Sequence, residues 1–141
     1  MAANSELWIA YAGEQLTGKI SFEKTGSSSL VKVLMNGRMD EKSSFITNMI
    51  VMAMENSPCE QAIYDLSGMI FVEGSWINDA AIDCVLSLIG YSSDHGMTAA
   101  LIIHDEFVRE IFTDTLRSNR CPAKLTICSD QDMIGKRLRC A

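Results

Sequence analysis

Many hydrolases use a serine, a histidine and a carboxylate together, and the chain offers Ser75, His104 and Asp65 as such a set. No motif supports this set, because the sequence contains no GxSxG, no P-loop, no GxGxxG after a strand and no HExxH. Any chain of similar length contains three residues of these types, so the set alone is weak evidence. We therefore predict a protein that is not an enzyme and has no catalytic residues.

Cysteine and histidine could also bind a metal, but their spacing does not favour this. The five cysteines form no CxxC pair, and none stands at metal-ligand spacing from His95 or His104. An odd number of cysteines suits a reducing compartment, with Cys84 and Cys128 as small core residues. We expect a cytoplasmic protein with no metal and no cofactor.

Asp65 has one further candidate chemistry, as the phosphoacceptor of a two-component receiver domain. Receivers need an additional acidic pair after the first strand, and Asp40 with Glu41 meets this requirement only loosely. The receiver interpretation remains an alternative.

Residues 61–88 contain the most informative stretch of the chain. The apolar run Ala62-Ile63-Tyr64 predicts a short buried strand that ends at Asp65. Gly68 and Gly74 predict turns after that strand.

A helix is predicted after Ser75, with its first turn within residues 71–78. The loop at residues 71–76 would then present backbone amides at a helix N-terminus, which suits an anion. The residues expected on the buried face of this helix are Ile77, Ala81, Cys84, Val85 and Leu88.

The rest of the chain alternates strands with helices. This order predicts an α/β fold with right-handed crossovers and a mixed, mostly parallel sheet of about five strands with about four helices. Gly37 is expected to adopt an unusual backbone angle, and Gly96 is expected to form a left-handed helix cap. The further strands are predicted at 19–23, 30–35, 98–103 and 123–128, and the further helices at 44–55, 105–117 and 129–138.

We expect an N-terminal extension over residues 1–17 and a single domain over residues 18–141. The run Leu7–Tyr11 could form an added edge strand or a partner-facing arm. The helix at 44–55 is apolar on nearly every side, so it is either a core helix or a face for self-association, which leaves a homodimer open.

The order of features in this chain resembles the STAS domain family of bacterial anti-sigma factor antagonists. Its signature is a strand ending in Asp-Leu-Ser, an apolar pair, and an acidic-Ser-Ser-Gly-Leu loop that opens a helix. Residues 64–67 and 71–77 stand at those places, and residues 36–40 resemble the Gly-x-Leu-Asp step of STAS domains. The resemblance covers residues 18–139.

The resemblance implies a phosphorylation switch. In phosphorylatable members, a partner serine kinase, which is also the anti-sigma factor, modifies the first serine after the acidic residue. The phosphate adds about −1.5 to −2 charges at the rim of the docking surface, so the modified surface repels the kinase. In this chain the acceptor position is Gly74.

Two interpretations of the neighbouring Ser75 remain open. If the loop is shifted by one residue, Ser75 could accept a phosphate. Otherwise Ser75 is a helix cap that stabilises by about 1 kcal/mol, and Glu73 with Gly74 leaves a surface that cannot be switched. Trp76 is either an exposed anchor for a protein partner or a residue buried against the sheet.

The net charge of −6 argues against nonspecific nucleic-acid binding, which needs clustered Lys and Arg. No window has the length of a membrane-spanning helix, so we expect no membrane insertion.

The resemblance therefore predicts a non-enzymatic interaction module that docks an anti-sigma factor, a serine kinase or another regulatory protein. Two alternatives remain: a scaffold or transporter-associated STAS subunit, and a small-ligand sensor. Ser75 is the phosphorylation candidate, and the predicted partner-binding residues are Asn36, Met39, Asp40, Glu73, Gly74, Ser75, Trp76, Ile77 and Asn78.

Overall fold

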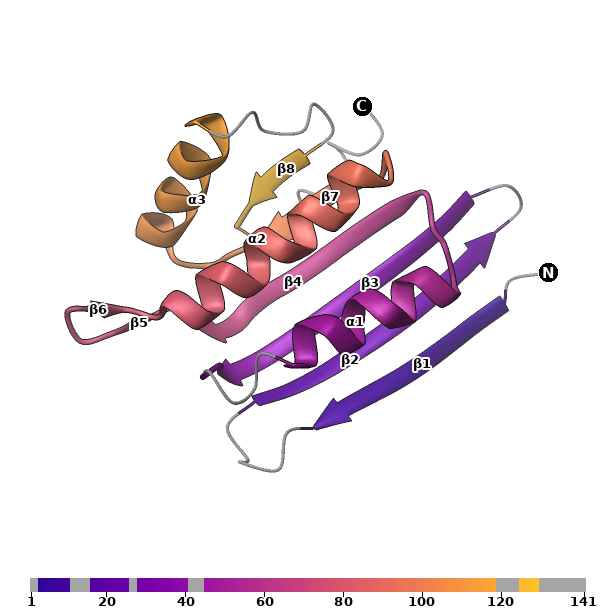
Figure 1. Ribbon diagram of the computed structural model, residues 1–141, viewed down its shortest axis with the longest axis horizontal. Helices are drawn as coiled ribbons and strands as arrows, with labels where there is room; N and C mark the ends of the chain where they lie inside the picture. Colours follow the sequence, from indigo (N-terminus) through magenta and orange to yellow (C-terminus); the bar gives the residue numbers. More distant parts are fainter. Residues whose placement is uncertain (1–2, 11–15, 26–27, 41–44, 119–124, 130–141) are drawn as a thin grey trace.

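The computed structural model describes residues 3–10, 16–25, 28–40, 45–118 and 125–129. Its main feature is a six-stranded sheet with strand order β1-β2-β3-β4-β7-β8 (Figure 1). The strands of this sheet are β1 (Ala3–Ala10), β2 (Leu16–Thr25), β3 (Ser28–Arg38), β4 (Gln61–Ile70), β7 (Thr98–Ile102) and β8 (Leu125–Cys128). The helices within the described ranges are α1 (Phe45–Asn56), α2 (Asp79–Asp94) and α3 (Glu106–Ser118).

The predicted α/β fold with a mostly parallel sheet is confirmed. Strands β3, β4, β7 and β8 are parallel, whereas β1 and β2 extend the sheet in antiparallel order. The sixth strand is β1, so the N-terminal run is an edge strand. The described residues contain three helices rather than four, and the fourth predicted helix, at 129–138, lies outside them apart from Ser129.

All three helices pack on one face of the sheet (Figure 1). From β3 onward each new strand is added on the same side of the previous one, and crossovers of one hand then place every helix on the same face. A second, smaller apolar cluster of Ala100, Ile102 and Cys128 lies on the opposite face of β7 and β8. The parallel strand β7 is therefore buried on both faces, as predicted.

Two strands are longer than their apolar runs indicate. β2 begins at Leu16, a core residue inside the segment assigned to the N-terminal extension. β4 continues past Asp65 to Ile70, so the prediction that this strand ends at Asp65 is wrong. Beyond Asp65, which is opposite the last residue of β7, β4 pairs with β3 alone, and a short apolar run could not reveal that pairing.

α1 has one buried face, formed by Ile46, Ile50 and Met54. The opposite side of this helix exposes large apolar side chains, among them Met49 and Met52. The interpretation as a core helix therefore accounts for only part of its apolar surface.

The two glycine predictions are confirmed. Gly37, near the end of β3, has φ 109°, and Gly96, after α2, has φ 64°. At Gly96 the left-handed angle ends the helix, where the amides of Gly96 and Met97 bond to the carbonyls of Ser93 and Ser92.

Candidate functional site

The segment between β4 and α2 is a small hairpin rather than the first turn of a helix. β5 (Val72–Glu73) and β6 (Trp76–Ile77) pair antiparallel around the two-residue turn Gly74-Ser75. Gly74 has φ 62°, and two-residue hairpin turns require such an angle at their first central position. At the base of the hairpin the amide of Asn78 donates to the carbonyl of Phe71 at 2.7 Å.

The predicted helix start is therefore wrong. α2 begins at Asp79 and is capped by Asn78, whose Oδ1 accepts from the amide of Ala81 at 3.2 Å. Ser75 is not a helix cap, and the amides of residues 71–76 do not form an anion site at a helix N-terminus. Ile77 is 42 % exposed in β6, whereas Ala81, Cys84, Val85 and Leu88 form the buried face of α2 as predicted.

Two side-chain contacts tie the hairpin and the start of α2 to the end of β3. The Arg38 guanidinium forms an ion pair and hydrogen bond with the Glu73 carboxylate, and this bond raises the pKa of Arg38 above its ordinary value. Asn78 Nδ2 donates to the carbonyl of Met39 at 2.7 Å. These contacts place two groups of predicted partner-binding residues side by side. One group follows β3 and includes Met39, and the other includes Glu73 and Asn78.

The base of the hairpin is fixed in the core. The ring of Phe71 packs edge-on against Phe112 of α3, with 5.7 Å between the ring centroids. Met39 is also buried, with 1 % of its surface exposed. Its side chain belongs to the core and is not available to a partner, so the prediction that Met39 binds a partner directly is wrong.

Asn36 and Gly68 approach each other closely where β3 pairs with β4. The register of the two strands shifts between Leu34 and Asn36, and Asn36 is then opposite Gly68. A Cβ atom at Gly68 would lie 1.8 Å from Asn36 Oδ1, so glycine is the residue that accepts the Asn36 side chain in its present position. Gly68 was expected in a turn, but it lies within a strand.

The hairpin exposes a large aromatic side chain. Trp76 is 78 % exposed, so the alternative that buries it against the sheet is wrong. Ile77 beside it and Ile70 at the end of β4 are 42 % and 41 % exposed. We use the name hairpin surface for Asn36, Asp40, Glu73, Gly74, Ser75, Trp76, Ile77 and Asn78, all of which are at least partly exposed.

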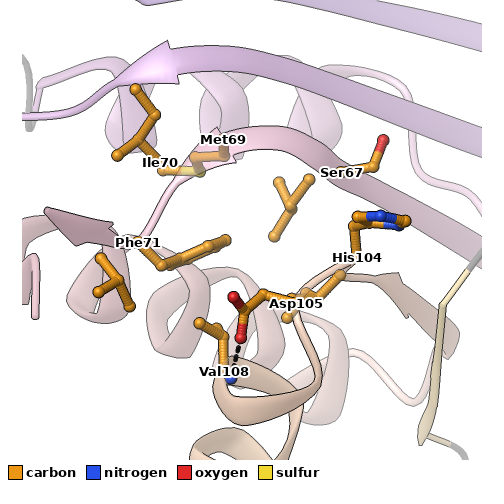
Figure 2. A pocket seen from close by; sticks show the side chains of 10 residues that line it. Ser67, Met69, Ile70, Phe71, His104, Asp105 and Val108 are labelled. Carbon is orange, nitrogen blue, oxygen red and sulfur yellow. Dashed lines mark hydrogen bonds between the residues drawn. The ribbon is translucent and has the colours of Figure 1, made fainter. Parts of the chain in front are cut away.

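A cavity of about 230 Å³ lies on the other side of β4, between the end of that strand and the start of α3. Its floor is apolar and includes Phe71 and Val108. Figure 2 shows Ser67 and His104 at one end of the cavity, with Asp105 bonded to the amide of Val108 at 3.0 Å. This cavity could hold a small apolar molecule with a polar group.

Asp65 lies within β4 and is 6 % exposed. Its Oδ1 accepts hydrogen bonds from the amide and the hydroxyl of Ser67, at 3.2 and 2.7 Å. The hydroxyl of Ser75 belongs to the hairpin turn, so the residues grouped as a catalytic set come from separate elements.

Comparison of the chain with models of known protein families and with curated protein sequences gives no match. No helix in the described ranges is long and apolar enough to cross a membrane. Within those same ranges, no group of three or more His, Cys, Asp or Glu side chains could hold a metal ion.

Sequence reasoning missed Arg38 and Gly68. Arg38 lies within residues 36–40, which resemble the Gly-x-Leu-Asp step of STAS domains, but it was not predicted to pair with another residue. Its charge is opposite to that of Glu73. A single sequence gives no sign that residues 35 positions apart form a pair.

Proposed function

We propose that this chain is a STAS-like, non-enzymatic interaction module of bacterial regulation that docks a cytoplasmic protein partner through the hairpin surface. The partner class that the resemblance favours is an anti-sigma factor or serine kinase. The observation that carries the proposal is Trp76, an indole that is 78 % exposed on a hairpin. Tryptophan is enriched among the few residues that dominate the energy of protein interfaces.

The side-chain contacts at the base of the hairpin support this proposal. The Arg38–Glu73 ion pair and the Asn78–Met39 hydrogen bond hold the hairpin against the end of β3. A surface that is ordered before binding loses less conformational entropy when a partner docks. Trp76 can therefore act as an anchor with little cost for ordering its backbone.

We propose constitutive docking, without the usual serine switch. Gly74 occupies the acceptor position of the family and cannot be phosphorylated. Ser75 is exposed in the hairpin turn, which supports its accessibility to a kinase. A phosphate there would stand beside Glu73 and Trp76, so regulation through Ser75 is the competing form of the same proposal.

The test is affinity capture from the native cell extract with wild type, Trp76→Ala, Ser75→Asp and a control, Phe107→Ala. Phe107 is also an exposed aromatic, at 57 %, but it lies on α3 outside the hairpin surface. We expect an anti-sigma factor or serine kinase to be captured by wild type, Ser75→Asp and Phe107→Ala, and to be lost with Trp76→Ala. Loss with Ser75→Asp as well would support the switch. Equal capture by all four proteins would overturn docking through the hairpin surface.

The cavity between β4 and α3 favours a second candidate function, a small-ligand sensor. It lies at the carboxyl edge of parallel strands, where open α/β sheets commonly bind ligands. A rise in melting temperature with nucleotides or fatty acids, lost when Val108→Trp fills the cavity, would support this function. Unchanged melting with every compound would reject it.

A further inference from the structure

The cavity between the end of β4 and the start of α3 combines an apolar wall with one carboxylate. Among the ten described residues that line it, Asp105 is the single acidic residue, and none is lysine or arginine. The wall includes Leu66, Phe71 and Val108, each at most 4 % exposed. A negative charge beside a dry apolar surface restricts the chemistry of a ligand that can bind there.

One oxygen of the Asp105 carboxylate is used by the protein, and the other is open to a ligand. Oδ1 accepts from the amide of Val108 at 3.0 Å and so caps α3. Figure 2 shows the carboxylate turned toward Phe71, over the cavity. Within the described part of the chain, no further donor bonds to this carboxylate. Its second oxygen can therefore accept a hydrogen bond from a ligand.

Arg109 does not neutralise Asp105, although the two residues stand four positions apart, a spacing that allows an ion pair on a helix. The guanidinium Nη1 of Arg109 instead donates to the carbonyls of Ile103 and His104, at 2.8 and 2.7 Å. The described residues supply no ion pair to Asp105. The charge of Asp105 thus remains available to a ligand in the cavity.

The other polar groups at the cavity also offer acceptors rather than donors. The hydroxyl of Ser67 donates its one hydrogen to Asp65 at 2.7 Å, so toward a ligand its oxygen can only accept. The amide of Val108 already donates to Asp105. An ammonium group carries three N–H donors and a positive charge, which match these acceptors. A carboxylate or a phosphate would instead bring a second negative charge beside Asp105.

The volume of the cavity favours a small ligand. Its volume is about 230 Å³, which is the volume of about eight water molecules in the liquid. Pockets for drug-sized ligands have about 300–1,000 Å³. One aromatic ring with a short arm is a body of the smaller size, and burial of such a ring against Leu66 and Phe71 would remove apolar surface from water.

We infer that this cavity binds a small apolar amine, with the ammonium group on Asp105 and the apolar body against Phe71 and Val108. A hydrogen bond between two charged groups is about twice as strong as one between neutral groups. The inference rests on the small-ligand function proposed above as the second candidate, and it adds amines to the compounds that test that function. It is independent of docking, because no residue of the hairpin surface lines the cavity.

The test compares three ligands of similar shape and different charge, namely phenethylamine, phenethyl alcohol and phenylacetate. Each is titrated into the protein at neutral pH, where the amine is protonated, while NMR follows the backbone amides and so locates the site. We expect the amine to shift the amides of His104, Asp105 and Val108 and to bind about tenfold more tightly than the alcohol. Phenylacetate should bind most weakly.

Two variants separate the charge of Asp105 from that of its neighbour Glu106. Asp105→Asn keeps a side-chain oxygen that can cap α3, so folding should be retained. Glu106→Gln removes an equal charge from an exposed residue that does not line the cavity. We expect Asp105→Asn to bind the amine and the alcohol equally well, and Glu106→Gln to keep the preference of wild type.

Two results would overturn the inference and leave the small-ligand function standing. One is an alcohol that binds wild type as tightly as the amine does. The other is a preference for the amine that persists in Asp105→Asn. If none of the three compounds shifts the amides around the cavity, the inference is wrong and the small-ligand function loses its support as well, whereas docking through the hairpin surface is unaffected.

Discussion

At the scale of single residues, the contact between Gly68 and Asn36 makes a sharp prediction. The Cβ of Gly68→Ala would meet Asn36 Oδ1, the far end of an exposed side chain that can rotate away. We expect the free energy of unfolding to change by no more than about 1 kcal/mol, because alanine also favours a strand over the unfolded chain. In urea unfolding, Asn36→Ala should make Gly68→Ala more favourable by about 0.5 kcal/mol or more. Strictly additive effects would show that the two side chains do not compete for space.

Tyr64 predicts a pH dependence of stability. Its hydroxyl donates to the carbonyl of Leu88 at 3.3 Å and shares a hydrogen bond with Ser92, and burial raises its pKa to about 12. Tyrosine in an unfolded chain titrates near pH 10, so the stabilisation is complete below that pH and is lost as the pH rises toward 12. The loss should reach about 2–3 kcal/mol. Tyr64→Phe should remove this decline, and the partly exposed Tyr91→Phe should retain it. Parallel stability profiles for wild type and Tyr64→Phe above pH 10 would refute the assignment.

At the scale of elements, the start of α2 distinguishes Ser75, which the sequence indicated as a helix cap, from Asn78, which caps the helix in the structure. Asn78→Ala removes the helix cap and the hydrogen bond to the carbonyl of Met39, so we expect a loss of about 1–2 kcal/mol. Ser75→Ala changes an exposed residue of the hairpin turn and should have almost no effect. Chemical unfolding of the two variants measures both values. A larger loss at Ser75 than at Asn78 would mean that the helix begins at the hairpin turn.

The hairpin also shows where prediction from sequence fails. Ile77 continues the apolar spacing of Ala81 and Leu88, so helical periodicity extended α2 one turn too far. The Gly74-Ser75 turn was a local sign of a hairpin, but strands of two residues are too short to show alternation. The pairing of Arg38 with Glu73 depends on the fold and could not be predicted from one sequence.

At the scale of the whole molecule, the architecture was far easier to predict than the site. The arrangement of the strands follows from apolar runs such as Thr98–Ile102, because a strand that is buried on both faces is typical of the interior of a parallel sheet. The family resemblance also predicted that Asn36 and Asp40 would lie near the residues of the hairpin. The degree of exposure did not follow, because Met39 and Trp76 are both apolar and only packing determines that one is buried and the other is not.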